Sequence, residues 1–265
     1  RRYGSTNTFE KNNYPVGYNL GQSGNTPSQN LVDAYEMIDG TPFDWNNPEH
    51  KSNPYANRDP RLAMSILTNN VEFKDRTIEA WTGGRDGKGV IHATRTGYYI
   101  YKFIDPNLDL LQNRTSVHHW VIMRYAEILL SYAEAMNEAY GPTGNVGYRL
   151  NAVRALNQVR NRVGVEMPAV PTAISKEELR EKIRNERRVE LAFEDHRFWD
   201  VRRWMIAPET LGTPLRGVEI TKISDEEFEY KPIEVEKRTF EPKMYLYPIP
   251  QADLNTTGWV QNPLW

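Results

Sequence analysis

The sequence predicts a mainly α-helical protein that also contains an irregular, loop-rich part and a few short strands. Apolar residues recur every three or four positions between Ile122 and Met136, and again between Tyr148 and Val159. This spacing places them on one face of an α-helix. A third helix is indicated by Ser-Lys-Glu-Glu at 175–178, whose first and last side chains can form a capping box.

The bulk composition excludes several functional classes. The 265 residues suffice for one large domain or two ordinary ones, and the net charge is -2. Such a charge provides no general attraction to nucleic acid. The chain has no cysteine, which excludes disulfides, thiolate metal sites and a cysteine nucleophile. It also lacks a run of about 18 apolar residues, which a membrane-spanning helix needs.

The first part of the chain, residues 1–117, is expected to be loop-rich. Residues 1–30 are polar and rich in turn formers, and residues 31–40 predict a short helix that ends with a glycine. Residues 41–61 contain too many Pro and Asn residues for regular structure, yet they carry several aromatic rings. Long irregular loops of this kind are often functional.

Short strands are predicted in the remainder of this part. The segments LAMSIL (62–67) and VEFK (71–74) have the composition of strands, and TGYYIYKFID (96–105) is apolar on both faces, as in a strand covered on both sides. The intervening WTGGRDGKG (81–89) is predicted to be a loop. It lacks the spacing and the following Ser or Thr of a phosphate-binding loop.

Residues 118–265 are expected to form the helical part. GPTG at 141–144 separates the first two helices, and Gly164 ends the second. Together they resemble one tetratricopeptide-type hairpin, and such hairpins bury both faces only when about three or more repeats stack. The chain also opens on Arg1 without an initiator Met or a signal peptide. We therefore expect further helices upstream.

The third helix carries carboxylates on its apolar face. On a helical wheel, Leu179, Ile183, Glu186, Glu190 and Phe193 fall on one stripe. A buried carboxylate is costly unless it is paired, so each is expected to contact a guanidinium group. The candidate partners are arginines downstream or on the preceding hairpin, namely Arg197, Arg202 and Arg203, or Arg124, Arg154 and Arg160.

The charges of residues 175–204 nearly cancel. This stretch has nine Lys or Arg and eight Asp or Glu residues, a net charge of +1. A surface that binds phosphate or another anionic partner would need arginines without matching carboxylates. We therefore predict an internal ion-pair scaffold that includes Glu186, Glu190, Arg197 and Arg202, in preference to an anion-binding surface or a catalytic site.

Several motifs, in order, resemble the SusD/RagB family. They span about residues 28–265 and comprise LVDAYEMIDG, NPYANRDPRLAMSIL, RTGYYIYKF, MRYAEILLSYAEAMNEA, LNAVRALNQVRNRVG, ERRVELAFEDHRFWDVRRW, YLYPIPQADL and QNPLW. The resemblance implies a SusD-like fold with tetratricopeptide-type hairpins. It also implies a protein without catalytic activity or cofactor, held on the outer face of a Gram-negative outer membrane. The lipidated cysteine and N-terminal helices of the family would precede Arg1.

The resemblance further implies a partner and a ligand. Family members cooperate with a SusC-like TonB-dependent transporter and deliver an oligosaccharide, or in some members a peptide, for import. A sugar offers flat C–H faces and hydroxyl groups, which favours aromatic rings beside Asp, Asn or Arg. The loops that contain this mixture supply our candidate ligand contacts: Trp45, Tyr55, Trp81, Arg85 and Asp86. The tryptophans of the family motifs, Trp199, Trp204, Trp259 and Trp265, are expected in the core.

Two other functions stay open at this point. A glycoside hydrolase would need a cleft with paired carboxylates about 5–9.5 Å apart. A tetratricopeptide-type adaptor would bind a peptide or protein in a concave helical groove. A metal site is not predicted, because the pair His118-His119 lacks a third ligand at suitable spacing.

Overall fold

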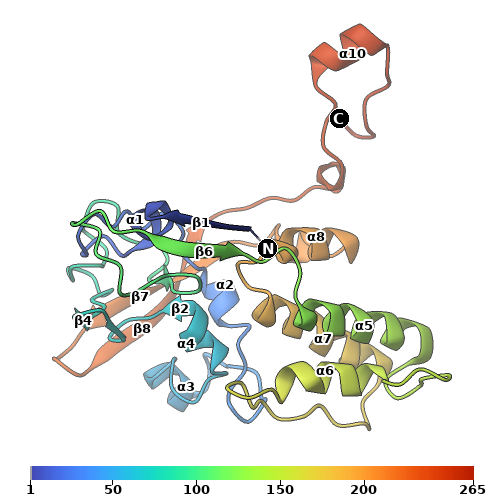
Figure 1. Ribbon diagram of the computed structural model, residues 1–265, viewed down its shortest axis with the longest axis horizontal. Helices are drawn as coiled ribbons and strands as arrows, with labels where there is room; N and C mark the ends of the chain where they lie inside the picture. Colours follow the sequence, from blue (N-terminus) through green and yellow to red (C-terminus); the bar gives the residue numbers. More distant parts are fainter. Residues whose placement is uncertain (1) are drawn as a thin grey trace.

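The computed structural model describes residues 2–265 and confirms a mainly helical fold with short two-stranded sheets (Figure 1). The helices are α1 (Thr8–Asn13), α2 (Gln29–Val32), α3 (Pro48–Ser52), α4 (Arg61–Ser65), α5 (Tyr125–Tyr140), α6 (Ala152–Arg160), α7 (Lys176–Glu190), α8 (His196–Arg203), α9 (Ala207–Thr210), the 3-10 helix η1 (Pro242–Tyr245) and α10 (Gln251–Thr257). The strands are β1 (Arg2–Thr6), β2 (Ile66–Leu67), β3 (Glu72–Phe73), β4 (Arg76–Thr77), β5 (Tyr99–Ile100), β6 (Ser116–Trp120), β7 (Leu215–Lys222) and β8 (Phe228–Glu236). They form four antiparallel pairs: β1 with β6, β2 with β5, β3 with β4, and β7 with β8.

The helical part follows the predicted periodicity. Helices α5 and α6 form a hairpin, and α7 packs against both. Ala133 of α5 and Ala155 of α6 are fully buried, and their small side chains allow the two helices to approach closely. The predicted stripe is too long at its start, because Ile122 and Tyr148 precede α5 and α6 and are exposed.

The predicted capping box is present at the start of α7. The Ser175 hydroxyl accepts a hydrogen bond from the Glu178 backbone N–H at 3.1 Å, and the Glu178 carboxylate accepts one from the Ser175 N–H at 3.0 Å. We expect Ser175→Ala to lower the free energy of unfolding by about 1 kcal/mol, because one helix N–H group loses its acceptor. Thr172→Ala, in the exposed loop just before α7, is the control for urea denaturation. Equal stability of the two variants would contradict this role.

Some predicted boundaries are wrong for local reasons. Residues 61–65 form α4 and not a strand, because the Asp59 side chain accepts the backbone N–H of Arg61 and Pro60 fixes a helical φ of -55°. Only the two residues that follow are extended, as β2. The helix predicted at 31–40 ends at Val32, and the rest of that segment is mainly turns. Helix α7 ends at Glu190, so Phe193, the last residue of the predicted apolar stripe, lies outside the helix and has a φ of +63°.

The largest correction is the β7–β8 hairpin, since residues 118–265 were expected to form a helical part. It packs on the first part of the chain, where the backbone N–H of Val218 donates to the carbonyl of Thr96 at 2.9 Å. The two segments approach so closely that a Cβ on Gly97 would lie 2.7 Å from the Val218 side chain. Gly97 also has a φ of +85°, which favours glycine.

The buried side chains form two clusters. One lies mainly within residues 14–110 and includes Tyr35, Tyr98 and Tyr99, together with Val218, Ile220 and Tyr230 of the hairpin. The other joins α5, α6 and α7. The predicted division into 1–117 and 118–265 stays a prediction. Strand β6 spans the boundary between these two ranges, and the β7–β8 hairpin packs in the first cluster. The C-terminal segment that carries η1 and α10 extends away from both clusters (Figure 1).

Candidate ligand-binding site

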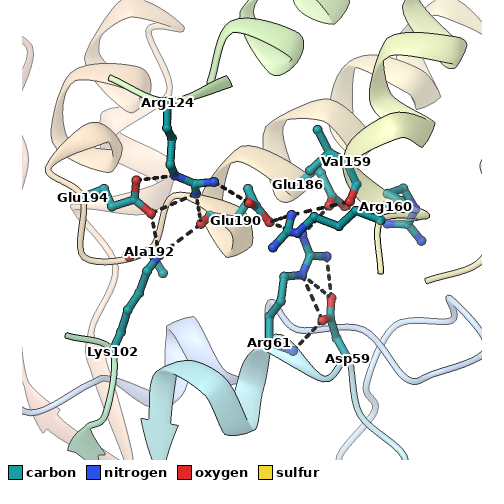
Figure 2. A network of polar contacts seen from close by, with 11 residues as sticks. Asp59, Arg61, Lys102, Arg124, Val159, Arg160, Glu186, Glu190, Ala192 and Glu194 are labelled. Carbon is teal, nitrogen blue, oxygen red and sulfur yellow. Dashed lines mark hydrogen bonds and ion pairs between the residues drawn. The ribbon is translucent and has the colours of Figure 1, made fainter. Parts of the chain in front are cut away.

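The carboxylates on the apolar face of α7 are buried in a network of cations (Figure 2). Arg61 contacts Glu186 at 2.5 Å and Glu190 at 2.9 Å, and it pairs with Asp59 at 2.6 Å. The second oxygen of Glu186 receives Arg160 at 2.8 Å. All of these side chains are at most 4% exposed. The network therefore joins α4, α6 and α7.

The same network continues towards the start of α5. Glu190 also accepts from Arg124 at 2.7 Å and from Arg162 at 2.6 Å. Burial by itself raises the pKa of Glu190, but the hydrogen bonds from Arg162, Arg124 and Arg61 outweigh it and lower the pKa to about 2. Arg124 and Lys102 hold Glu194 at 2.6 and 2.5 Å. The cations also lower the pKa of Glu194 against the effect of burial, so Glu190 and Glu194 are ionised and neutralised from within at neutral pH.

Two arginines that we placed in this scaffold lie outside it. Arg202 donates to the backbone carbonyls of Met244 and Tyr245, at 2.6 and 3.0 Å, and stacks over aromatic rings. Arg197 forms no ion pair in the part of the chain that the structure describes. Helix α7 ends at Glu190, and both arginines belong to the separate helix α8. They are therefore not on the helix face that carries the carboxylates.

Aromatic rings form a row beside the β7–β8 hairpin. Tyr55 meets Tyr230 edge-on with ring centroids 5.3 Å apart, and Tyr230 lies 6.4 Å from Phe228. Phe228 lies in turn 5.4 Å from Trp81. The hairpin thereby brings two of the predicted contacts, Tyr55 and Trp81, into one row. Each of the two is partly exposed and packs on the first cluster.

Trp45 lies outside this row. Its indole N–H donates to Asp33 at 3.0 Å, and its ring meets Phe43 edge-on at 5.1 Å. Phe43 in turn lies under the guanidinium of Arg58, 4.1 Å from the ring centroid. Trp45 is partly buried against the first cluster, so its proposed contact with a ligand stays a prediction.

The two charged candidates in the 81–89 loop differ in their surroundings. Arg85 is exposed and pairs with Glu79 at 2.6 Å. Asp86 is completely buried, and its oxygens accept from Arg76 at 2.6 and 2.9 Å and from the backbone N–H groups of Gly17 and Glu79. Its expected contact with ligand is therefore corrected: Asp86 holds the loop in place and does not face solvent.

A cavity of about 510 Å³ opens between residues 52–71 and the turn of the hairpin. This volume falls within the range of about 300–1,000 Å³ that small-molecule sites usually have. Its lining combines aromatic rings, amides and hydroxyl or carboxylate oxygens: Tyr55, Phe228, Tyr230, Asn53, Asn69, Asn70, Thr68, Glu226 and Glu227 are among the residues involved. Sequence reasoning missed the hairpin residues, although Phe228 and Tyr230 alternate as strand residues do.

Two other cavities, of about 740 and 610 Å³, lie along β6. They belong to an exposed apolar face that includes Trp120, Ile122, Met123, Tyr125 and Trp199. Among the described residues that line them, none is an Asn or a Gln. Because a side-chain amide can both donate to and accept from sugar hydroxyls, the 510 Å³ cavity, which has amides beside its rings, is the better candidate for a glycan.

The expected core placement of the family-motif tryptophans is wrong for most of them. Trp199, Trp259 and Trp265 are 64%, 63% and 44% exposed. Trp199 belongs to the short α8, whose buried residues are Asp200 and Val201, and the other two belong to the C-terminal segment that leaves the two clusters. Trp204 is partly buried and donates to Glu134 at 2.8 Å.

Residues 2–265 contain no candidate metal site and no candidate membrane-spanning helix. This part of the chain has no group of three or more His, Asp or Glu side chains arranged to hold a metal ion. No helix in it combines the length and the hydropathy required to cross a bilayer. His118 contacts the buried carboxylate of Glu10 at 3.0 Å, which is a packing role.

A comparison with family descriptions decides the relationship. The SusD family matches residues 1–265. The chain belongs to the SusD family. This family is one of non-catalytic binding proteins, which favours a binding role over the glycoside hydrolase considered above.

Individual SusD-like proteins support this assignment. A SusD-like protein from Bacteroides fragilis is 33% identical, with a TM-score of 0.75 over 93% of this chain and 48% of its own. A SusD-like carbohydrate-binding protein from the same species is 30% identical, with a TM-score of 0.76 over 96% of this chain and 52% of its own. SusD-like protein P2 of Formosa agariphila is 34% identical over 120 residues, 22% of its length. The chain thus spans about half the length of these solved SusD-like structures.

Proposed function

We propose that this protein captures an oligosaccharide at the cell surface and delivers it to a SusC-like TonB-dependent transporter. The observation that carries the proposal is the 510 Å³ cavity, where a row of aromatic rings meets side-chain amides in a chain of the SusD family. Rings of this kind cover the C–H faces of a sugar, and amides bind its hydroxyl groups. A relative of similar fold is a carbohydrate-binding protein.

The location and the partner are part of the same proposal. We propose that the protein acts on the outer face of the outer membrane through a lipid anchor, as the family resemblance implies. The cavity lies beside the β7–β8 hairpin, and no residue of the α5–α6 helical hairpin lines it. This position favours a glycan receptor over a tetratricopeptide-type adaptor. Copurification of the native protein with a SusC-like transporter from the same cells tests the partnership, and a transporter preparation free of this protein would contradict it.

Binding without cleavage is the main expected result. In native gels that contain soluble polysaccharides, the protein should be retarded by at least one polysaccharide, and no shorter products should form. Failure of every polysaccharide to retard the protein, or the appearance of products, would contradict the proposal.

Trp81→Ala should weaken this retardation, because Trp81 supports Phe228 at one end of the ring row. The expected loss is several-fold in affinity, since an aromatic pair contributes about 0.5–1.5 kcal/mol beyond its burial. Trp259→Ala is the matched control, because Trp259 is exposed in the C-terminal segment away from the cavity. Equal affinities of the two variants would remove Trp81 from the site.

A further inference from the structure

Two buried donor groups in the lining of the 510 Å³ cavity have no acceptor in the protein. They are Nε of Arg58 and Nδ2 of Asn69, and their residues are 6% and 4% exposed. Buried polar groups are nearly always hydrogen-bonded, and leaving one unpaired costs about 1–3 kcal/mol. Two such donors in one cavity therefore indicate a ligand that brings acceptor oxygens.

The rest of each side chain is firmly held. Arg58 donates to the carbonyls of Pro54, Val32 and Tyr35 at 2.6 to 2.7 Å. Burial lowers the pKa of Arg58 to about 10, an effect that nearby Asp33 partly offsets. The guanidinium is thus charged at neutral pH, and its Nε–H group is left without a hydrogen-bond partner.

Asn69 is fixed in a similar way. Its Oδ1 accepts from the backbone N–H of Ala80 at 3.1 Å, which identifies Nδ2 as the donor left over. Burial raises the pKa of the Tyr230 hydroxyl, and the neighbouring Asn69 amide lowers it in part, but Nδ2 has no hydrogen-bond partner of acceptable geometry. The donor therefore lies beside the aromatic row and is held for an acceptor from outside the protein.

The rim of the cavity has the opposite character. Glu226 and Glu227 lie in the hairpin turn, are exposed and line the cavity. Ionised carboxylates only accept hydrogen bonds, and they repel an anionic ligand. The ligand must therefore offer acceptors to the interior, donors to the rim and an apolar face to Tyr55, Phe228 and Tyr230, and the two exposed carboxylates of the rim disfavour a negatively charged one.

We propose that the cavity binds a neutral sugar residue of an oligosaccharide, with its hydroxyl oxygens accepting from Arg58 Nε and Asn69 Nδ2 and with Glu226 and Glu227 excluding acidic glycans. A hydroxyl group is both donor and acceptor, so one sugar ring satisfies the interior and the rim together. This inference rests on the proposed function and adds to it the ligand class and the residues that select it.

The first test changes the donor alone. Asn69→Asp preserves the shape and the oxygen that accepts from Ala80, but it replaces the free donor with an acceptor. We expect at least about a tenfold loss of affinity for the neutral oligosaccharide that binds best among maltohexaose, cellohexaose, xylohexaose and laminarihexaose, measured by calorimetry. Asn145→Asp makes the same change at an exposed position outside the cavity and should leave the affinity as it is.

The second test changes the rim and does not depend on the first variant folding. The double variant Glu226→Gln, Glu227→Gln should raise the affinity for oligogalacturonate relative to the neutral oligosaccharide by about tenfold, because two repulsive charges are lost. An unchanged ratio, or tighter binding of oligogalacturonate than of every neutral sugar by the original protein, would overturn the inference.

The outcomes separate the two proposals. If neutral sugars bind but Asn69→Asp binds as well as Asn145→Asp, the cavity assignment is wrong and glycan capture stands. If no oligosaccharide binds, or if casein-derived peptides bind in their place, the proposed function itself fails. Folding of each variant is checked by its thermal unfolding curve, so that a lost fold is not counted as a lost site.

Discussion

Arg61→Met is expected to lower the free energy of unfolding by about 3–5 kcal/mol, because it removes the cation shared by three buried carboxylates. Asp59 loses its guanidinium partner, while Glu186 and Glu190 each lose one of several cations. Burial by itself lowers the pKa of Arg61, but the surrounding carboxylates raise it above its ordinary value. Methionine has a similar length and favours helix, so the change acts mainly on charge.

The measurement is urea denaturation followed by tryptophan fluorescence. The control is Arg180→Met, which removes the pair with Glu138 on the surface of α7, where the carboxylate is 42% exposed. Exposed pairs of this kind contribute at most about 1 kcal/mol. Similar losses in the two variants would show that the buried network does not link α4 to α7 as we describe.

The second large effect is a loss of stability in acid. The pKa of Glu190 falls from 4.5 in the unfolded chain to about 2 in the folded protein. A lowered folded pKa means that the stabilisation is fully present above pH 4.5 and is lost as the pH falls towards 2. At 1.36 kcal/mol per pKa unit, the contribution of Glu190 is about 3 kcal/mol.

The check compares the free energy of unfolding at pH 5.5 and pH 2.5 at constant ionic strength. The original protein should lose more stability over this interval than Glu190→Gln, by about 2.5 kcal/mol, because the variant has no carboxylate to protonate at this position. The variant will also be less stable throughout, since its arginines lose an anionic partner. Parallel losses in the two proteins would contradict the low pKa of Glu190.

Local sequence signals predicted the helical part well. The apolar stripe of α5, the break at Gly141 and the Ser175 capping box depend on residues within a few positions of one another, and each is present. The β7–β8 hairpin was missed because its strands alternate weakly and it is stabilised by contact with distant residues such as Thr96. The strand predicted at 62–67 was wrong because the Asp59 side chain accepts a hydrogen bond from the Arg61 N–H and so favours the start of a helix there.

The candidate site shows the same limit. The composition of the loops indicated Tyr55 and Trp81, but it could not distinguish them from Asp86, whose partners Arg76 and Gly17 come from elsewhere in the chain. The sequence could not predict that Arg58 Nε and Asn69 Nδ2 lack a hydrogen-bond acceptor. Whether a donor is unpaired depends on which carbonyl groups the fold places around it.

The helical wheel predicted that the carboxylates on α7 are buried, but it could not identify all of their arginine partners. Arg61 lies 125 residues before Glu186, and no periodicity relates them. The sequence showed that positive and negative charges nearly cancel within residues 175–204. In the structure, the arginines that pair with Glu186 and Glu190 come largely from α4, α6 and the start of α5.

The most direct test of the account is a crystal structure of the protein soaked with the neutral oligosaccharide that binds it best. We expect electron density for a sugar ring between Tyr55 and the hairpin turn, with oxygens within hydrogen-bond distance of Arg58 Nε and Asn69 Nδ2. A sugar bound instead to the arginines of α7 and α8, or on the apolar face beside β6, would contradict it.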